Sequence, residues 1–253
     1  MTPREKLLRL AGGLPAGCVW LGLGNAMAAE AAGRAGARLA VVDAEHGVID
    51  TGRLPDILRA LALTGAGALV RVGAAGSAEV KRALDAGADG ILFPQIETVE
   101  AARAAIAPML FPPAGTRGSA LGVVRAAGFG TVADYGTAWN DRALAAVQIE
   151  SRRGLSAADA IAEVAGVDML FFGPFDYATD AGLDPVADAP VLAAAFAEVV
   201  EAAHRAGKIA GVFPWPTATP AELAAAGADM IAIASDLRAV MDAVAAGLSA
   251  MPR

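Results

Sequence analysis

The sequence predicts an α/β fold, a closed (β/α)8 TIM barrel of eight parallel strands. Short apolar runs typical of buried strands alternate with helical patterns along the chain, and eight strand–helix steps can be counted. The length of 253 residues is the usual size of one such barrel. We therefore expect a single domain over residues 1–253.

Each predicted strand is a run of four to seven mostly apolar residues, as expected when helices cover both faces of a parallel sheet. In chain order these runs are 17–23, 39–43, 68–71, 90–93, 145–149, 169–172, 208–213 and 230–234.

Alanine-rich amphipathic segments predict the covering helices. Thr98 can cap one of them, because its hydroxyl can accept a hydrogen bond from a backbone N–H of the first turn. Gly207 is placed to end another. The clearest predicted helices span 26–35, 53–64, 98–107, 190–206 and 236–246.

One connection is too long for an ordinary loop. Residues 109–142, between the fourth and fifth strands, are rich in Gly and Pro. Long loops in compact domains are usually functional. We expect this segment to extend over the mouth of the barrel.

Composition argues against several classes of protein. The chain is 56% hydrophobic, yet it has no run of about 18 to 20 apolar residues that could cross a membrane. A net charge of −7 argues against a nucleic-acid partner, which calls for a basic face. Cys18 is the only cysteine and the N-terminus shows no signal-peptide pattern, so a cytoplasmic protein is expected.

Acids that follow the fifth and sixth strands form the centre of the predicted site. Glu150 directly follows the run 145–149, and Asp176 follows the run 169–172. In a (β/α)8 barrel, residues just past the C-terminal ends of the strands face one mouth. Two carboxylates with only oxygen ligands nearby suit Mg²⁺ or Mn²⁺. We expect Glu150 and Asp176 to hold such an ion.

Further polar residues follow strands and should face the same mouth. Taken singly, each has a simpler explanation: an Arg after a strand is often in a surface ion pair, a loop His is ordinarily exposed, and Glu150 could pair with Arg152 or Arg153. Their joint placement favours a site. The further residues are Asp43, His46, Arg71, Gln95 and Gln148.

The residue inventory narrows the chemistry. With two histidines in the chain, a His-rich zinc centre cannot form, and His204 is expected on the outer face of a helix. None of the lysines Lys6, Lys81 and Lys208 is placed for a Schiff base, so carbonyl chemistry would rely on a metal. No glycine-rich or Walker pattern indicates a nucleotide. Cys18 is expected to pack in the core.

Seven short motifs carry a family resemblance: Asp43-Ala44-Glu45-His46-Gly47, Val70-Arg71, Leu84-Asp85-Ala86-Gly87-Ala88, Pro94-Gln95, Phe111-Pro112-Pro113-Ala114-Gly115-Thr116-Arg117-Gly118, Gln148-Ile149-Glu150-Ser151, and Gly166-Val167-Asp168 with Gly173-Pro174-Phe175-Asp176. In order and spacing they resemble the HpcH/HpaI aldolase family, and within it the class II pyruvate aldolases. The resemblance covers about residues 19–237.

The resemblance implies an enzyme that reversibly cleaves 4-hydroxy-2-oxo acids to pyruvate, or a related 2-oxo acid, and an aldehyde, through an enolate that the metal stabilises. Glu150 and Asp176 match the ligands of a divalent ion, Mg²⁺, Mn²⁺ or Co²⁺. His46 matches the catalytic base, and Asp85 the acid that raises its basicity. Arg71 matches the residue that stabilises the enolate.

The resemblance also implies the substrate contacts. Gln148 matches a substrate-binding residue. The backbone N–H groups of Phe175 and Asp176 match those that hold the donor carboxylate, with Gly173 at the start of the same turn. Asp43 is counted with the catalytic residues of this mouth.

Family members are similar to barrels whose last helix packs on a neighbouring subunit, commonly in hexamers. The resemblance therefore implies a homo-oligomer in which the helix 236–246 contacts a neighbour. The chain departs from its relatives at Phe175 and Tyr177, which replace common Ala and Leu, and at Ala178, which replaces a common Ser. Because Phe175 and the aromatic stretch 213–216 bring bulk to the mouth, the acceptor aldehyde cannot be carried over.

Two other functions remain open at this point. A lyase or decarboxylase acting on oxaloacetate or an acyl-CoA thioester would share the enolate, although no basic or glycine-rich rim for the CoA nucleotide is evident. A barrel that has lost catalysis and acts as a binding module is the other. The presence of His46, Arg71, Glu150 and Asp176 argues against it.

Overall fold

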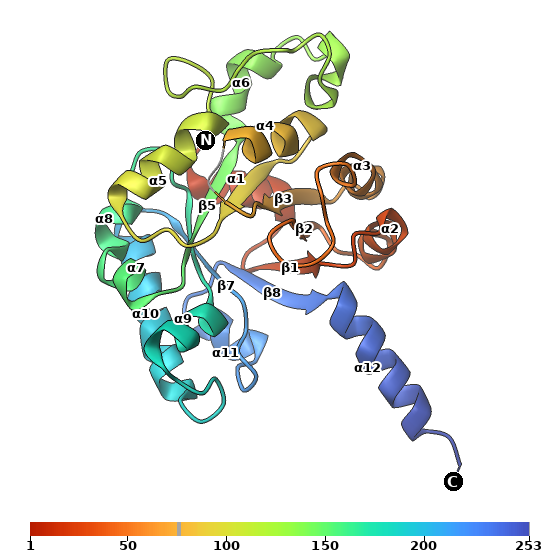
Figure 1. Cartoon of the computed structure of the whole chain (residues 1–253), viewed down its shortest axis with the longest axis vertical. Helices are drawn as coiled ribbons and strands as arrows, with labels where there is room; N and C mark the ends of the chain where they lie inside the picture. Colours follow the sequence, from red (N-terminus) through yellow and green to blue (C-terminus); the bar gives the residue numbers. More distant parts are fainter. Residues whose placement is uncertain (75–76, 253) are drawn as a thin grey trace.

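A computed structural model describes residues 1–74 and 77–252 of the chain. Its eight strands are all parallel and close into a barrel in sequence order, which confirms the predicted fold (Figure 1). The strands are β1 (Ala16–Leu21), β2 (Leu39–Asp43), β3 (Gly67–Arg71), β4 (Gly90–Phe93), β5 (Leu144–Ile149), β6 (Met169–Phe172), β7 (Ile209–Val212) and β8 (Met230–Ser235).

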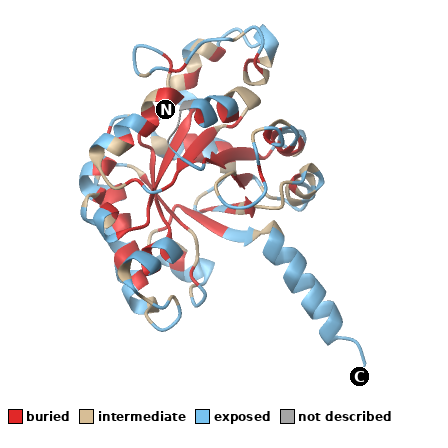
Figure 2. Ribbon diagram, in the orientation of Figure 1, coloured by how far each residue is buried: buried red, intermediate tan, exposed pale blue. Residues whose placement is uncertain are grey.

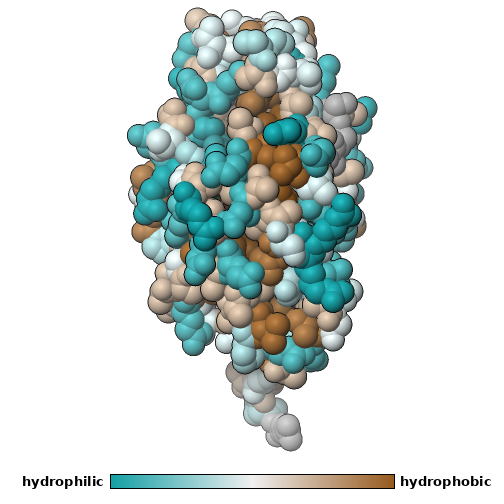
Figure 3. Space-filling model, turned by 90° about the vertical axis from the view of Figure 1, so that its left-hand side faces the viewer, coloured by the Kyte–Doolittle hydropathy of each residue, from teal (hydrophilic) through white to brown (hydrophobic). Residues whose placement is uncertain are grey.

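Helices surround the barrel, and the expected cap is present at Thr98, whose side chain accepts a hydrogen bond from Ala101 N. The helices are α1 (Pro3–Ala11), α2 (Ala26–Arg34), α3 (Leu54–Thr64), α4 (Ser77–Ala86), α5 (Val99–Ile106), α6 (Tyr135–Arg142), α7 (Arg152–Ser156), α8 (Ala158–Ala162), α9 (Pro174–Ala181), α10 (Ala189–Arg205), α11 (Pro220–Ala225) and α12 (Asp236–Ser249), with short 3-10 helices at Ala107–Met109 and Arg125–Gly130. Many hydrophilic side chains cover the face that carries α5, α7 and α8 (Figure 3).

The N-terminal end of the barrel is closed by α1 and holds no predicted site residue. Lys6 is buried there and its Nζ lies 2.9 Å from Asp168 Oδ1. Cys18 is fully buried inside the barrel, and burial raises the pKa of its thiol to about 12. Lys6 is thus engaged far from the mouth, and Cys18 packs in the core as expected.

The segment 109–142 lies beside the barrel and packs against α4. Arg125 Nη1 donates to Ala86 O at 2.8 Å, and Arg117 Nη2 lies 3.1 Å from Asp85 Oδ1, so two polar contacts tie the segment to this helix. None of its residues lines the mouth cavity described below. Contrary to the prediction, the segment 109–142 therefore does not cover the mouth of its own barrel, because its polar contacts tie it to α4.

The last helix, α12, leaves the barrel instead of covering it. Figure 1 shows it projecting from the end of β8, and Figure 2 shows it exposed along all but its first residue. None of its residues is buried. Among the described residues, no helix is long and apolar enough to cross a membrane.

Candidate active site

A cavity of about 710 Å³ opens at the C-terminal ends of the strands and contains most of the predicted residues. This is the end at which (β/α)8 barrels carry their active sites. Predicted residues that line it are Asp43, His46, Arg71, Gln148, Gly173, Phe175 and Asp176. None of the residues that line this cavity is a lysine.

Glu150 and Asp176 line a second, smaller cavity of about 370 Å³, and Asp176 borders both cavities. Glu150 Oε1 accepts a hydrogen bond from Gln95 N at 2.7 Å, and its Oε2 accepts one from Gln148 Nε2 at 2.7 Å. Burial, together with the nearby carboxylates of Asp176 and Glu45, raises the pKa of Glu150 to about 7, although the hydrogen bond from Gln95 N acts in the opposite direction. The structure therefore brings the two predicted ligands together as mutually repelling acids.

The backbone at Gln95 and at Gly173 fixes the position of the Glu150 carboxylate. Gln95 has a φ of +53°, a left-handed conformation that is uncommon for a residue other than glycine and is concentrated at functional sites. This conformation accompanies the donation from Gln95 N to Glu150. On the other side, a Cβ at Gly173 would lie 2.6 Å from Glu150 Oε2, so a larger residue there would force Glu150 to move.

These residues fit a hard divalent cation. Mg²⁺ is commonly held by one or two carboxylates and takes its remaining oxygens from water and substrate. The described residues contain no group of three or more His, Cys, Asp or Glu in metal-binding geometry, so the protein would supply the Glu150 and Asp176 carboxylates. A further oxygen, Oε1 of Gln148, is buried and has no hydrogen-bond partner among the described residues.

Helix α9 presents free backbone donors to the mouth. Gly173 precedes it, Pro174 occupies its first turn, and Asp176 lies in that turn as well. Tyr177 N donates to Gly173 O, whereas the N–H groups of Phe175 and Asp176 have no partner among the described residues. A helix N-terminus with free N–H groups favours a bound anion. This geometry suits the predicted contact with a donor carboxylate.

Arg71 is held rigidly at the base of the mouth. Its Nε and Nη2 donate to the two oxygens of Asp43 at 2.9 and 2.6 Å, and its Nη1 lies 2.9 Å from Glu45 Oε2. Burial raises the pKa of Asp43, but the hydrogen bonds and charge of Arg71, with the Trp20 and His46 N–H groups, bring it below its usual value. Asp43 is therefore an ionised residue that positions Arg71 rather than a group that takes a proton.

His46 stands at the rim. Its backbone N–H donates to Asp43 Oδ1 at 3.2 Å, which ties its loop to the end of β2. The side chain is 66% exposed, and Nε2 lies 3.9 Å from Glu45 Oε2. The imidazole is thus free to meet a substrate that enters the cavity.

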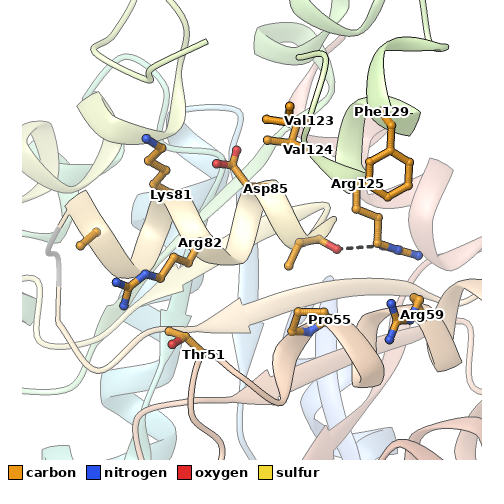
Figure 4. A pocket seen from close by; sticks show the side chains of 12 residues that line it. Thr51, Pro55, Arg59, Lys81, Arg82, Asp85, Val123, Val124, Arg125 and Phe129 are labelled. Atoms are coloured by element: carbon orange, nitrogen blue, oxygen red, sulfur yellow. Dashed lines mark hydrogen bonds between the residues drawn. The ribbon is translucent and has the colours of Figure 1, made fainter. Parts of the chain in front are cut away.

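Asp85 is not brought to this mouth in its own chain. It lies on α4 in a separate cavity of about 650 Å³, where Figure 4 shows it near Val123 and Val124 of the segment 109–142. Its carboxylate is paired with Arg117. The predicted partnership of Asp85 with His46 is therefore not formed within one chain, because α4 turns Asp85 towards the outside of the barrel.

The aromatic residues divide between mouth and core. Phe175 is 45% exposed, lines the mouth, and packs edge-on against Phe213 with ring centroids 6.0 Å apart. Tyr177 and Ala178 are buried, and Tyr177 packs on Phe172. Of the three side-chain departures from the relatives, Phe175 is the one that faces the mouth.

Two residues of the site escaped the sequence analysis. Glu45 holds Arg71 from one side, and Trp20, near the end of β1, contacts both Arg71 and Asp43. Glu45 was visible only as part of a motif. For Trp20 the available signal was a large aromatic residue near the C-terminal end of a barrel strand, where side chains can face the mouth.

Comparisons with known proteins agree with this geometry. Residues 17–243 match the family model for HpcH/HpaI aldolase/citrate lyase. The chain is 37% identical over 241 residues to the hydroxypyruvate/pyruvate aldolase of Agrobacterium fabrum, covering 92% of this chain and 91% of the relative. It is 37% identical over 221 residues to the 5-keto-4-deoxy-D-glucarate aldolase of Shigella dysenteriae, covering 87% and 86%.

A solved structure is similar over nearly its whole length. A HpcH/HpaI aldolase/citrate lyase family protein from Burkholderia cenocepacia superimposes with a TM-score of 0.89 at 37% identity, covering 98% of both chains. Sequence motifs, barrel topology and the acids at the mouth thus lead to one assignment. This chain belongs to the HpcH/HpaI aldolase/citrate lyase family and is a carbon–carbon lyase of the aldolase type.

Proposed function

We propose that this aldolase is metal-dependent and reversibly cleaves 4-hydroxy-2-oxo acids to pyruvate, or a closely related 2-oxo acid, and an aldehyde. The observation that carries the proposal is the convergence of three features on one mouth: the Glu150 and Asp176 pair, the fixed guanidinium of Arg71, and the free N–H groups of α9. The name of the Agrobacterium relative favours pyruvate and hydroxypyruvate as donors.

Each part of the site has a task on a 2-oxo acid. The N–H groups of Phe175 and Asp176 bind the carboxylate and fix its orientation. Glu150 and Asp176 would hold a divalent ion, which would supply Lewis-acid polarisation of the keto group. Arg71 places positive charge where the keto oxygen becomes negative as C3 loses a proton. His46 takes that proton at the rim of the cavity.

The same residues serve the second half of the reaction. The C3 carbanion equivalent attacks the aldehyde carbon, and the proton that His46 took from C3 returns to the alkoxide that forms. In the cleavage direction these transfers are reversed. The apolar side of the cavity, formed by Phe175 and Phe213, is where the acceptor would lie.

The direct test is exchange of pyruvate C3 protons with deuterated solvent, followed by NMR without any aldehyde. The wild-type protein should catalyse the exchange. EDTA should abolish it, and Mg²⁺, Mn²⁺ or Co²⁺ should restore it. Full exchange in EDTA, or trapping of the donor on the protein by borohydride, would be incompatible with the proposed class of aldolase.

Replacement of Phe175 by Ala should change the choice of acceptor. The ring limits space on the acceptor side and offers no hydrogen bond, so we expect the wild type to prefer small or apolar aldehydes over succinic semialdehyde. Discrimination by apolar volume is about 1 to 3 kcal/mol, so Phe175→Ala should shift kcat/KM towards longer aldehydes by about one or two decades. The measurement is kcat/KM for an aldehyde series at saturating pyruvate. An unchanged profile, or loss of pyruvate binding, would contradict this placement of the ring.

We also propose that α12 packs on a second copy of the chain. Its exposed apolar side chains recur at spacings of three or four residues and therefore share one face. Each is more than half exposed in the single chain, a cost that contact with a neighbour would remove. The face consists of Leu237, Val240, Met241, Val244 and Leu248. In such an assembly, Asp85 of one subunit could lie close to the mouth of another.

A charge placed on this face of α12 should dissociate the oligomer into smaller species. Val244→Glu should shift the mass measured by light scattering towards the monomer, because the carboxylate would be buried against an apolar surface. Ala246→Glu is the matched control, since residue 246 lies on the opposite side of the same helix. An identical mass for the wild type and Val244→Glu would refute the proposed contact.

A further inference from the structure

We propose that Trp20 is a positioning residue of this active site, which orients Arg71 through a hydrogen bond to Asp43 and through its ring. Trp20 lies in β1, is 7% exposed, and lines the mouth cavity. The kinetic consequence rests on the proposed function, whereas the contact itself can be tested without turnover.

The Trp20 indole N–H completes the set of hydrogen-bond donors around the Asp43 carboxylate. Trp20 Nε1 donates to Asp43 Oδ2 at 3.0 Å, the same oxygen that accepts from Arg71 Nη2 at 2.6 Å. The other oxygen accepts from Arg71 Nε and from the backbone N–H groups of Glu45 and His46. If the indole donor were lost, Oδ2 would keep only Arg71 as a partner, and the pair would lose its one side-chain hydrogen bond from β1.

The ring acts on Arg71 directly. Arg71 Cζ lies 4.9 Å from the centroid of the Trp20 ring, within the range of a cation–π contact. The indole is itself held by Phe213 and Phe171, whose ring centroids lie 5.2 and 5.9 Å away. Trp20 is therefore a packed support that touches both members of the Arg71–Asp43 pair.

The register of the barrel explains why one residue can serve both. Asp43 and Arg71 are directly paired positions of β2 and β3, and β1 pairs with β2 on the other side. The guanidinium must face the keto oxygen in one orientation for its charge to act. A support on the β1 side restricts the direction in which the pair could tilt.

The test compares Trp20→Phe with Trp215→Phe. The first variant keeps a ring in the mouth but removes the indole N–H. The second makes the same change at a buried tryptophan that packs on Phe196 outside the mouth. Trp20→Phe should lower kcat for pyruvate C3 exchange about 10-fold, because hydrogen bonds to charged groups are the stronger ones. The KM for pyruvate should change less than about 3-fold, because α9 holds the carboxylate. Trp215→Phe should leave both within about 2-fold.

A double-mutant cycle shows whether Trp20 acts through Asp43. In an Asp43→Asn background the Trp20→Phe change should lower kcat by less than about 2-fold, since the acceptor charge has already been removed. Equal losses in both backgrounds, or a loss in Trp215→Phe as large as in Trp20→Phe, would overturn the proposal.

Nitrogen-15 NMR tests the contact independently of activity. The Arg71 Nε–H signal, assigned by its loss in Arg71→Lys, should shift in Trp20→Phe and not in Trp215→Phe. The Trp20 indole signal should shift in Asp43→Asn. Unmoved signals would refute the positioning role even in an active enzyme. Absence of C3 exchange in the wild type would refute the proposed function while the NMR result still decides on Trp20.

Discussion

Replacement of Glu150 by Gln should lower pyruvate C3 exchange by about 10³-fold, because it removes one of the two charged ligands that we propose for a divalent ion. Such an ion contributes several kcal/mol of transition-state stabilisation, and about 4 kcal/mol corresponds to this factor. The neutral amide would also be mismatched, since Gln95 N and Gln148 Nε2 both donate to the carboxylate it replaces. Binding of Mn²⁺, followed by its electron paramagnetic resonance signal, should weaken in parallel.

Glu97 supplies the matched control for this prediction. It lines the same small cavity, but its carboxylate accepts from Ser151 Oγ and pairs with Arg153 instead of facing Asp176. Glu97→Gln should therefore keep Mn²⁺ binding and exchange near the wild-type values. If Glu150→Gln bound Mn²⁺ as tightly as Glu97→Gln does, Glu150 would not be a ligand.

The fold and most of the mouth could be predicted because they depend on local patterns. Strand ends carry polar side chains, and a closed parallel barrel gathers those ends at one mouth. Asp43 and Arg71 illustrate this: each was recognised as the last residue of an apolar run, and the register of β2 and β3 then sets them side by side. The acids Glu150 and Asp176 follow the same logic, since they come after β5 and β6.

The positions of some side chains depend on contacts with residues far away in the chain, and these positions could not be predicted from the sequence. Asp85 pairs with Arg117, 32 positions away in the chain, and only this contact reveals that it faces the segment 109–142. The same polar ties hold that segment on α4 rather than over the mouth. Tyr177 follows Asp176 in the chain, but the turn of α9 directs it into the core.

The direction of the Trp20 side chain could not be predicted from the sequence either. Apolar runs in parallel sheets are buried on both faces, so the period of two that would identify an inward-facing residue is lost. In β1 burial does alternate at first, since Gly17 is exposed and Val19 is half-buried, but neither residue is polar, so the sequence does not show this alternation. The direction of the indole towards Asp43 therefore required the barrel itself.

Replacement of His46 by Ala should slow C3 exchange by about 10²- to 10⁴-fold, the usual contribution of a general base. The fold should tolerate the change, because the imidazole is 66% exposed and it is the backbone N–H that bonds Asp43. The KM for pyruvate should stay near the wild-type value, since the α9 N–H groups and Arg71 remain. Exchange rates measured over a range of pyruvate concentrations separate these two effects.

His204, the other histidine of the chain, supplies the control variant for His46→Ala. His204 lies on α10, and its Nε2 is 2.8 Å from Asp229 Oδ2, which precedes β8 at the opposite end of the barrel. Asp229 also pairs with Arg4 and accepts from Ala210 N, so His204→Ala leaves it satisfied. That variant should exchange pyruvate protons at the wild-type rate. Added imidazole should restore part of the activity of His46→Ala, because the exposed rim leaves room for a free base to enter. Equal rates in the two alanine variants would show that the proton leaves C3 by a route that does not include His46.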